Sequence, residues 1–187
     1  MPLNLPNLVT LSRIILIPLL IGIYYVPWFS EETKNITATA IFIFAGITDW
    51  LDGYLARRLN QMSAFGAFLD PVADKLIVAG ALVVLLQLGR VDALVALIII
   101  GREIAISALR EWMAQIGAGR SVAVSYMGKI KTVSQMIAIP LLLYHDSIGA
   151  FAPQQVGTWL IYFAALLTLA SMGYYLKVAL PQAWRRP

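Results

Sequence analysis

Residues 49–75 read DWLDGYLARRLNQMSAFGAFLDPVADK, and they stand in a chain that otherwise consists largely of long apolar runs. The stretch contains four aspartates: Asp49, Asp52, Asp70 and Asp74. Spacings of three and of four residues place the two members of each pair on one helix face, about one turn apart. A short turn between two such helices would bring all four carboxylates together. The stretch therefore predicts a pair of helices that share an acidic site.

The composition of the chain predicts an integral membrane protein. Of 187 residues, 60% are hydrophobic and only 13% are charged, and the mean hydropathy is +0.78. Soluble domains are closer to half apolar and about a quarter charged. With no cysteine and one histidine, the chain cannot form disulfides, thiolate metal sites or paired-histidine sites. The first residues lack the basic segment and cleavage site of a signal peptide, so we expect a retained first helix.

Six segments approach the roughly 20 apolar residues that a membrane-spanning helix needs. They cover residues 8–28, 36–55, 65–88, 91–113, 131–144 and 156–176. The fifth segment is long enough to span a bilayer only if it extends back towards Tyr126. Because the connections are short and no linker or repeat is visible, we predict an all-α bundle of six transmembrane helices, forming a single domain over residues 1–187.

The distribution of basic residues predicts the orientation of this bundle. Six spans place both termini on one side, and the loops and ends of that side hold most of the loop Lys and Arg: Arg57, Arg58, Arg120, Lys129, Lys131, Arg185 and Arg186. The opposite loops hold only Lys34 and Arg90. Since cytoplasmic loops collect Lys and Arg, we expect cytoplasmic termini. The four aspartates would then lie at the cytoplasmic boundary of the membrane.

Four carboxylates brought together would repel one another and take up protons unless a counter-charge is present. Ligand sets made only of oxygen suit hard cations, so Mg²⁺ or Mn²⁺ is expected, and four carboxylates allow a site for two ions. A single Asp near a helix end more often pairs or reaches to the water boundary. Four at helical spacing favour a functional site, since ionisable residues within membrane segments are functional candidates.

The residues between the aspartates suit a bound phosphate ester. Gly53, Ala56 and Gly66 keep the carboxylate faces small, so that a substrate can approach the backbone. Arg57 can donate two parallel hydrogen bonds to phosphate oxygens. Near the start of the first span, Thr10 is a further candidate for contact with the substrate, with interfacial anchoring or helix capping as the alternative, and the same holds for Arg13.

The spacing of these residues resembles the signature of the CDP-alcohol phosphatidyltransferase family. The matching pattern is Asp49-x2-Asp52-Gly53-x2-Ala56-Arg57-x8-Gly66-x3-Asp70-x3-Asp74. The resemblance implies a six-helix membrane fold, a homodimer, two divalent metal ions, and transfer of a phosphatidyl or similar group from a CDP-linked donor to an alcohol with release of CMP. It implies that the first three aspartates are the main metal ligands. Asp74 would be the base that takes the proton from the attacking hydroxyl, and it would also contact metal. The residues Gly53, Ala56, Arg57 and Gly66 would line the CDP site.

Three further stretches resemble the bacterial members of this family that use glycerol 3-phosphate as the acceptor. They are NLPNLVTLSRIILIP at residues 4–18, GREIAISALREWMA at 101–114 and SVAVSYMGKIKTVSQM at 121–136. The resemblance implies CDP-diacylglycerol as the donor, and the first committed step of phosphatidylglycerol and cardiolipin synthesis. It also implies a place in the bacterial inner membrane, with the active site facing the cytoplasm.

Glycerol 3-phosphate is a small dianion, which requires fixed positive charge beside the acidic site. Basic residues of the fourth and fifth spans can supply this charge: Arg102, Arg110, Lys129 and Lys131. Arg102 and Arg110 are eight residues apart, which is about 80° around a helix, so both can point into one cavity. The two lysines are two residues apart and do not share a face, so we expect at most one of them to reach the ligand. Alternatively, these residues have structural or lipid-headgroup roles, and Arg102 is held by Glu103, by Glu111 or by an aspartate of the site.

Two other functions remain open at this point. The acceptor of the same reaction could be inositol phosphate, serine or a second phosphatidylglycerol, although serine has no phosphate to occupy the basic cluster. A cation-coupled transporter could also use buried aspartates. Transporters more often show inverted repeats and broken helices at the membrane midplane, and neither feature is visible in the sequence. Nothing in the sequence indicates a nucleic-acid partner.

Overall fold

The computed structural model describes residues 5–58, 64–115 and 126–183. Within these ranges the chain is helical, and an isolated bridge between Ile148 and Phe151 is the only extended pairing. The helices are α1 (Leu5–Gly22), η1 (Ile23–Tyr25), α2 (Glu31–Arg58), α3 (Ala64–Gln87), α4 (Ala93–Gln115), α5 (Tyr126–Tyr144) and α6 (Pro153–Ala183). The prediction of an all-α chain is therefore confirmed for the described residues.

The helices correspond to the six predicted segments, but several ends differ; α2, for example, begins at Glu31 and not at residue 36. α5 begins at Tyr126, so the fifth segment has the backward extension that it needed. α1 ends at Gly22 and gives way to the 3-10 helix η1 before Pro27, which has no N–H to continue a helix. α6 continues to Ala183, past the predicted end at residue 176. Hydropathy marks the apolar part of a helix, and α6 continues beyond that part.

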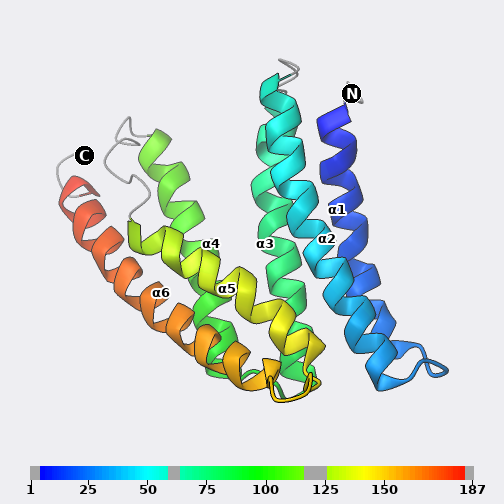
Figure 1. Cartoon of the computed structure of the whole chain (residues 1–187). Helices are drawn as coiled ribbons and strands as arrows, with labels where there is room; N and C mark the ends of the chain where they lie inside the picture. Colours follow the sequence, from blue (N-terminus) through cyan, green and yellow to red (C-terminus); the bar gives the residue numbers. More distant parts are fainter. Residues whose placement is uncertain (1–4, 59–63, 116–125, 184–187) are drawn as a thin grey trace.

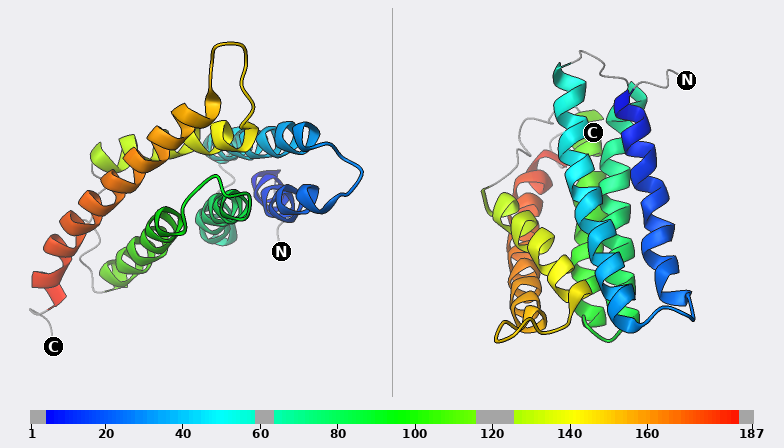
Figure 2. Two further views of the ribbon diagram at one scale, coloured as in Figure 1. Left: turned by 90° about the horizontal axis from the view of Figure 1, so that it is seen from below. Right: turned by 45° about the vertical axis from the view of Figure 1, so that its right-hand side comes forward.

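The helices form a bundle in which α1, α2 and α3 lie side by side, while α5 runs from α2 across to α6 (Figures 1 and 2). Both termini of the described chain lie towards one end of the bundle, here called the terminal end (Figure 1). The connections at residues 26–30, 88–92 and 145–152 lie at the opposite end, here called the loop end. The end of α2 and the start of α3 therefore meet at the terminal end.

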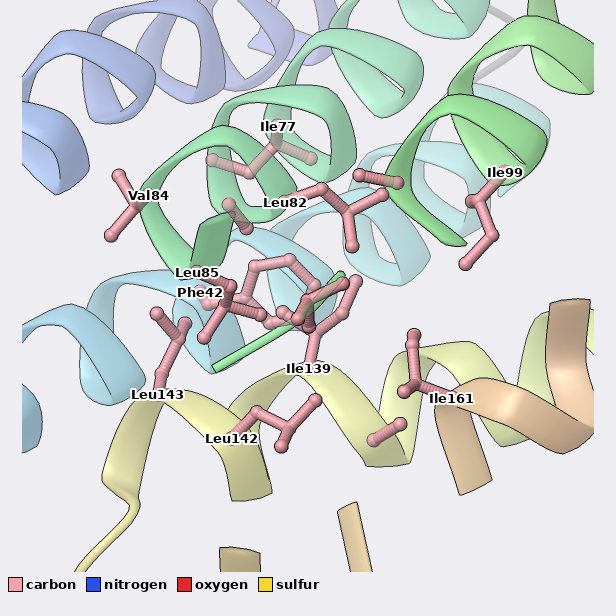
Figure 3. Close-up of a cluster of buried hydrophobic side chains, with 14 of the residues drawn as sticks. Phe42, Ile77, Leu82, Val84, Leu85, Ile99, Ile139, Leu142, Leu143 and Ile161 are labelled. Carbon is pink, nitrogen blue, oxygen red and sulfur yellow. The ribbon is translucent and has the colours of Figure 1, made fainter. Parts of the chain in front are cut away.

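A cluster of buried apolar side chains fills the bundle towards the loop end (Figure 3). Its largest members are Leu20, Phe42, Leu82, Leu85, Ile99, Ile139, Leu142 and Leu143, each at most 2% exposed. Close packing of these side chains gives the helices extensive van der Waals contact with one another. The buried polar side chains of the other half include Thr10, Arg13, Arg102, Lys131 and Gln135. The core thus holds the loop end together and leaves the terminal end for polar groups.

The outward faces of the helices are also apolar. Large exposed side chains occur on every α-helix, among them Ile15, Phe44, Phe68, Leu97, Val133 and Trp159. Monomeric soluble proteins rarely expose apolar patches larger than a few hundred Å². An apolar exterior combined with buried charges indicates a membrane protein.

Two stretches of the described helices are long and apolar enough to cross a membrane by length and hydropathy alone: Leu8–Tyr25 and Pro153–Tyr174. The other helices carry charged side chains within their apolar lengths, for example Asp74 in α3 and Arg102 in α4, which lower their mean hydropathy. Both of these residues belong to the site described below.

A hydrogen-bond network fastens the loop end. Arg90, between α3 and α4, donates through Nη1 to the carbonyl oxygens of Leu142 (3.1 Å) and Leu143 (2.8 Å), which are among the last carbonyls of α5. Its Nη2 donates to Asn35 Oδ1 of α2 (2.9 Å), and Asn35 Nδ2 donates to Asp146 Oδ2 (3.1 Å). Three segments that are distant in sequence are therefore fixed relative to one another.

α5 and α6 form the most extensive helix pair, and Gly157 lies at a close approach between them. A Cβ added at this position would lie 2.8 Å from Leu142 Cγ and 3.2 Å from the Ala138 carbonyl oxygen. We expect Gly157→Ala to be less stable than Gly173→Ala by about 1–3 kcal/mol, because it overpacks the contact. Gly173 is the matched control, since nothing lies within 4 Å of an added Cβ there. Thermal unfolding in detergent measures the difference, and equal unfolding temperatures would contradict the close packing.

Candidate active site

α1 supplies hydrogen-bond donors to the aspartates of α2 and α3. The hydroxyl of Thr10 donates to Asp70 Oδ1 (2.6 Å). Arg13 donates through Nη1 to Asp49 Oδ1 (2.8 Å) and also to Asp74 Oδ1. Thr10 and Arg13 are three residues apart, so they occupy the same face of α1. The structure thus brings the described carboxylates Asp49, Asp70 and Asp74 against one polar face of the first helix.

The environment of Arg13 differs from that of the carboxylates it contacts. Its side chain is 1% exposed, whereas those of Asp49 and Asp74 are 47% and 46% exposed. Thr10 is also buried, at 1%. Neither residue is therefore an interfacial anchor, the alternative left open by the sequence. The guanidinium thus contacts the two carboxylates from the buried side, and about half of each aspartate side chain remains exposed.

A cavity of about 390 Å³ opens beside these carboxylates, between α2, α3, α4 and α5. Asp49 and Asp74 contribute to its lining from α2 and α3. Arg102 and Arg110 contribute from α4. Apolar residues that include Phe42 continue the lining towards the core. One cavity therefore combines acidic groups, basic groups and an apolar wall.

The four basic residues predicted to bind the acceptor phosphate are placed differently. Arg102 is buried and donates to Ser171 Oγ of α6 (3.3 Å) and to Glu103 Oε1 (3.3 Å). Arg110 is exposed along the cavity lining. Lys131 is buried and bonds to Glu103, whereas Lys129 is exposed and lies outside the cavity lining. Arg102 and Arg110 are thus the two that line the cavity.

Several predicted donor-binding residues fall outside the described side chains. The backbone of α2 is described at these positions. The side chains of Asp52, Ala56 and Arg57 and the burial of Gly53 lie outside the described part of the structure. Gly66 is described, and it is buried in the first turn of α3. The predicted donor contacts of all five residues therefore remain predictions.

The cavity lining also contains charged and polar residues that the sequence did not single out as site residues. Lys75 directly follows Asp74 and lines the cavity. Glu103 accepts hydrogen bonds from both Arg102 and Lys131, so its negative charge partly offsets the basic cluster. Gln135 lines the cavity from α5. A polar residue such as Gln135 within an apolar helix is a signal for a functional site that can be read from the sequence. Which face of the helix lines the cavity depends, however, on how the helices pack against one another.

The carboxylates of the site are the groups that would hold the divalent cations predicted from the sequence. Asp49 and Asp74 approach the same guanidinium nitrogen, so their carboxylates lie close together. Carboxylate oxygens without nitrogen or sulfur ligands are typical of Mg²⁺ and Mn²⁺ sites. Within the described residues, no group of three or more Asp, Glu, His or Cys side chains is close enough to hold an ion. The side chain of Asp52, a predicted ligand, is not among them.

Comparison with known proteins extends the likeness to nearly the whole chain. The family model for CDP-alcohol phosphatidyltransferase matches residues 3–170. Proteins from Salmonella choleraesuis (strain SC-B67), Shigella flexneri and Escherichia coli (strain K12) are each 48% identical to this chain over 181 residues. The aligned part covers 96% of this chain and 96% of each relative, and all three are named CDP-diacylglycerol–glycerol-3-phosphate 3-phosphatidyltransferase. With the acidic cavity and this similarity together, the chain belongs to the CDP-alcohol phosphatidyltransferase family.

Proposed function

We propose that this chain transfers the phosphatidyl group of CDP-diacylglycerol to the 1-hydroxyl of sn-glycerol 3-phosphate and releases CMP. The observation that carries the proposal is the single cavity with Asp49 and Asp74 on one side and Arg102 and Arg110 on another. The names of relatives that share 48% identity over nearly the full chain support the same reaction.

The acidic side of the cavity suits activation of the acceptor alcohol. Asp74 takes the proton of the 1-hydroxyl as its oxygen attacks the lipid-side phosphorus of the donor. The new oxygen–phosphorus bond forms while the bond from that phosphorus to the bridging oxygen breaks, and CMP departs with the bridging oxygen. Arg13 orients the Asp74 carboxylate through its hydrogen bond. The half-exposed position of Asp74 leaves a free edge for the hydroxyl.

The basic side of the cavity suits the phosphate of the acceptor. Arg102 and Arg110 line the cavity, and an arginine can donate two parallel hydrogen bonds to phosphate oxygens. Lys131 supports this side through Glu103, and Lys129 remains a candidate at the water boundary. A bound phosphate would displace part of the Arg102–Glu103 contact, which is long at 3.3 Å.

The donor site in this proposal surrounds the signature residues. Asp49, Asp52, Gly53, Ala56, Arg57, Gly66 and Thr10 would contact the cytidine diphosphate group. Asp49, Asp52, Asp70 and Asp74 would hold two Mg²⁺ or Mn²⁺ ions, whose charge offsets that of the diphosphate. The acyl chains of the donor would remain in the bilayer against the apolar outer faces of the helices.

The proposal includes a membrane arrangement. All six α-helices would cross the bacterial inner membrane with both termini in the cytoplasm, supported by the excess of Lys and Arg on the terminal side. The cavity carboxylates lie in the half of the bundle nearer that side, so the site would face the cytoplasm, where a nucleotide-linked donor and a water-soluble acceptor can both reach it. Two copies would form a homodimer, a proposal that rests on family membership.

A CMP-release assay with a panel of acceptors tests the proposal. The purified protein receives CDP-diacylglycerol, Mg²⁺ and one of glycerol 3-phosphate, inositol phosphate, serine or phosphatidylglycerol. We expect CMP release with glycerol 3-phosphate to be at least about 100-fold faster than with the others, since the basic side of the cavity binds a small acceptor that carries a phosphate. A chelator should abolish it, and excess Mg²⁺ or Mn²⁺ should restore it. Fast release only with another alcohol would keep the chemistry and reject this acceptor, and chelator-resistant release would reject the metal site.

A further inference from the structure

Gln135 of α5 has an unusual environment for a buried amide. The residue is 4% exposed and lines the same cavity as Asp74 and Arg102. Its Oε1 atom is buried and has no hydrogen-bond partner among the described residues. Buried amide groups are almost always hydrogen-bonded, because an unpaired one costs free energy. The Oε1 atom of Gln135 is therefore available to accept a hydrogen bond from a group that enters the cavity.

The position of Gln135 along α5 lies at the boundary between polar and apolar surroundings. One turn towards the terminal end, Lys131 bonds to Glu103. One turn towards the loop end, Ile139 belongs to the apolar core. Gln135 thus lies where the inward face of α5 changes from polar to apolar side chains.

The other uncharged polar side chains of the cavity are already engaged. Ser107 Oγ donates to the carbonyl oxygen of Glu103 (2.8 Å), and Thr132 Oγ1 donates to that of Gly128 (3.0 Å). Each of these hydroxyls uses its proton within its own helix. The carboxamide of Gln135 offers one acceptor and two donors, which makes it suited to a ligand hydroxyl that both donates and accepts.

We propose that Gln135 binds the 2-hydroxyl of the glycerol phosphate acceptor and determines specificity for it. This assignment rests on the proposed function. The acceptor has three carbons: its 1-hydroxyl reaches Asp74, and its 3-phosphate reaches the arginines of α4. The 2-hydroxyl lies between these two groups. Ionised phosphate and carboxylate oxygens only accept hydrogen bonds and cannot pair with the Oε1 atom of Gln135, whereas the 2-hydroxyl can donate to it.

The test compares two acceptors that differ only in this hydroxyl. Propane-1,3-diol monophosphate keeps the attacking hydroxyl and the phosphate of glycerol 3-phosphate but lacks the 2-hydroxyl. We expect the wild-type protein to favour glycerol 3-phosphate by about 10- to 100-fold in kcat/KM for CMP release. In Gln135→Met, which has a side chain of similar size, kcat/KM for glycerol 3-phosphate should fall to near that of the analogue. The value for the analogue itself should change by less than about threefold.

Two controls separate recognition from structure. Ser134→Ala changes a buried neighbour that does not line the cavity, and it should leave the preference unchanged. The ligand-free Gln135→Met protein should unfold at a temperature no lower than wild type, because the variant removes an unpaired buried amide.

Three results would overturn the assignment of Gln135 and leave the proposed function intact. They are an equal loss of kcat/KM for both acceptors in Gln135→Met, no loss for either acceptor, and a marked fall in the unfolding temperature of the variant. A wild-type protein that releases no CMP with glycerol 3-phosphate would overturn the proposed function, and this assignment with it.

Discussion

Asp74→Asn is expected to lower kcat for CMP release by about 10³-fold while the protein remains folded, because general-base catalysis typically contributes 10²–10⁴-fold. Asparagine has nearly the same shape and can still accept a hydrogen bond from Arg13 through its oxygen, but it cannot take up the proton of the attacking hydroxyl. The KM for CDP-diacylglycerol should change by less than about threefold, since the donor is held mainly by other residues. Steady-state kinetics of CMP release measures both values.

The control for this variant is Asp92→Asn. Asp92 lies directly before α4, at the loop end of the bundle. Asp92 is exposed and accepts a hydrogen bond from Tyr162, away from the cavity. Its loss of charge should leave the activity within about twofold of wild type, as is usual for surface substitutions. If Asp74→Asn kept turnover close to that of Asp92→Asn, another group would be the base.

Replacement of Arg13 is expected to have the second largest effect. A single Nη1 atom of this buried side chain contacts both Asp49 and Asp74, so the guanidinium fixes the two carboxylates relative to each other. Arg13→Met should lower kcat/KM by about 100-fold, because a displacement of about 1 Å in a catalytic group can cost that much. Arg13→Lys should recover only part of the activity, since an ammonium is a point charge and lacks the planar fork of a guanidinium.

The matched control for Arg13 is another ion pair at the opposite end of the bundle. Lys34 contacts Glu31 across 2.7 Å, with the glutamate side chain 70% exposed. The Lys34 side chain is itself 12% exposed, but its carboxylate partner lies largely in water, so the pair contributes about 0–1 kcal/mol and Lys34→Met should have near-normal activity. If Arg13→Met were as active as Lys34→Met, the carboxylates would not depend on α1 for their positions.

Much of the fold could be predicted because the strongest physical signals are local. Long apolar runs determine where helices form in a membrane chain, and the segments at 65–88 and 91–113 agree with α3 and α4 to within two residues. The aspartate spacing likewise predicts which carboxylates share a face, since this depends only on the helical repeat. The far end of α6 was missed because a helix can continue beyond the apolar stretch that hydropathy detects.

The parts of the site that could not be predicted depend on how the helices are rotated against one another. The sequence predicts a basic cluster near Arg102 and offers Glu103 as one partner of Arg102, but the contact of Lys131 with Glu103 and that of Arg102 with Ser171 follow from the packing of α4 against α5 and α6. The same holds for Gln135, whose inward direction follows from the way α5 lies in the bundle. Arg13 could be proposed only as a possible ligand contact, because its two carboxylate partners lie 36 and 61 residues away in the sequence.

The proposed reaction can be measured as the transfer of labelled glycerol 3-phosphate into lipid by the purified protein in the presence of CDP-diacylglycerol and Mg²⁺. We expect chelator-sensitive incorporation of the label into a lipid-soluble product, with one CMP released for each acceptor incorporated. Release of CMP without incorporation of the label, or no release at all, would contradict the proposed reaction.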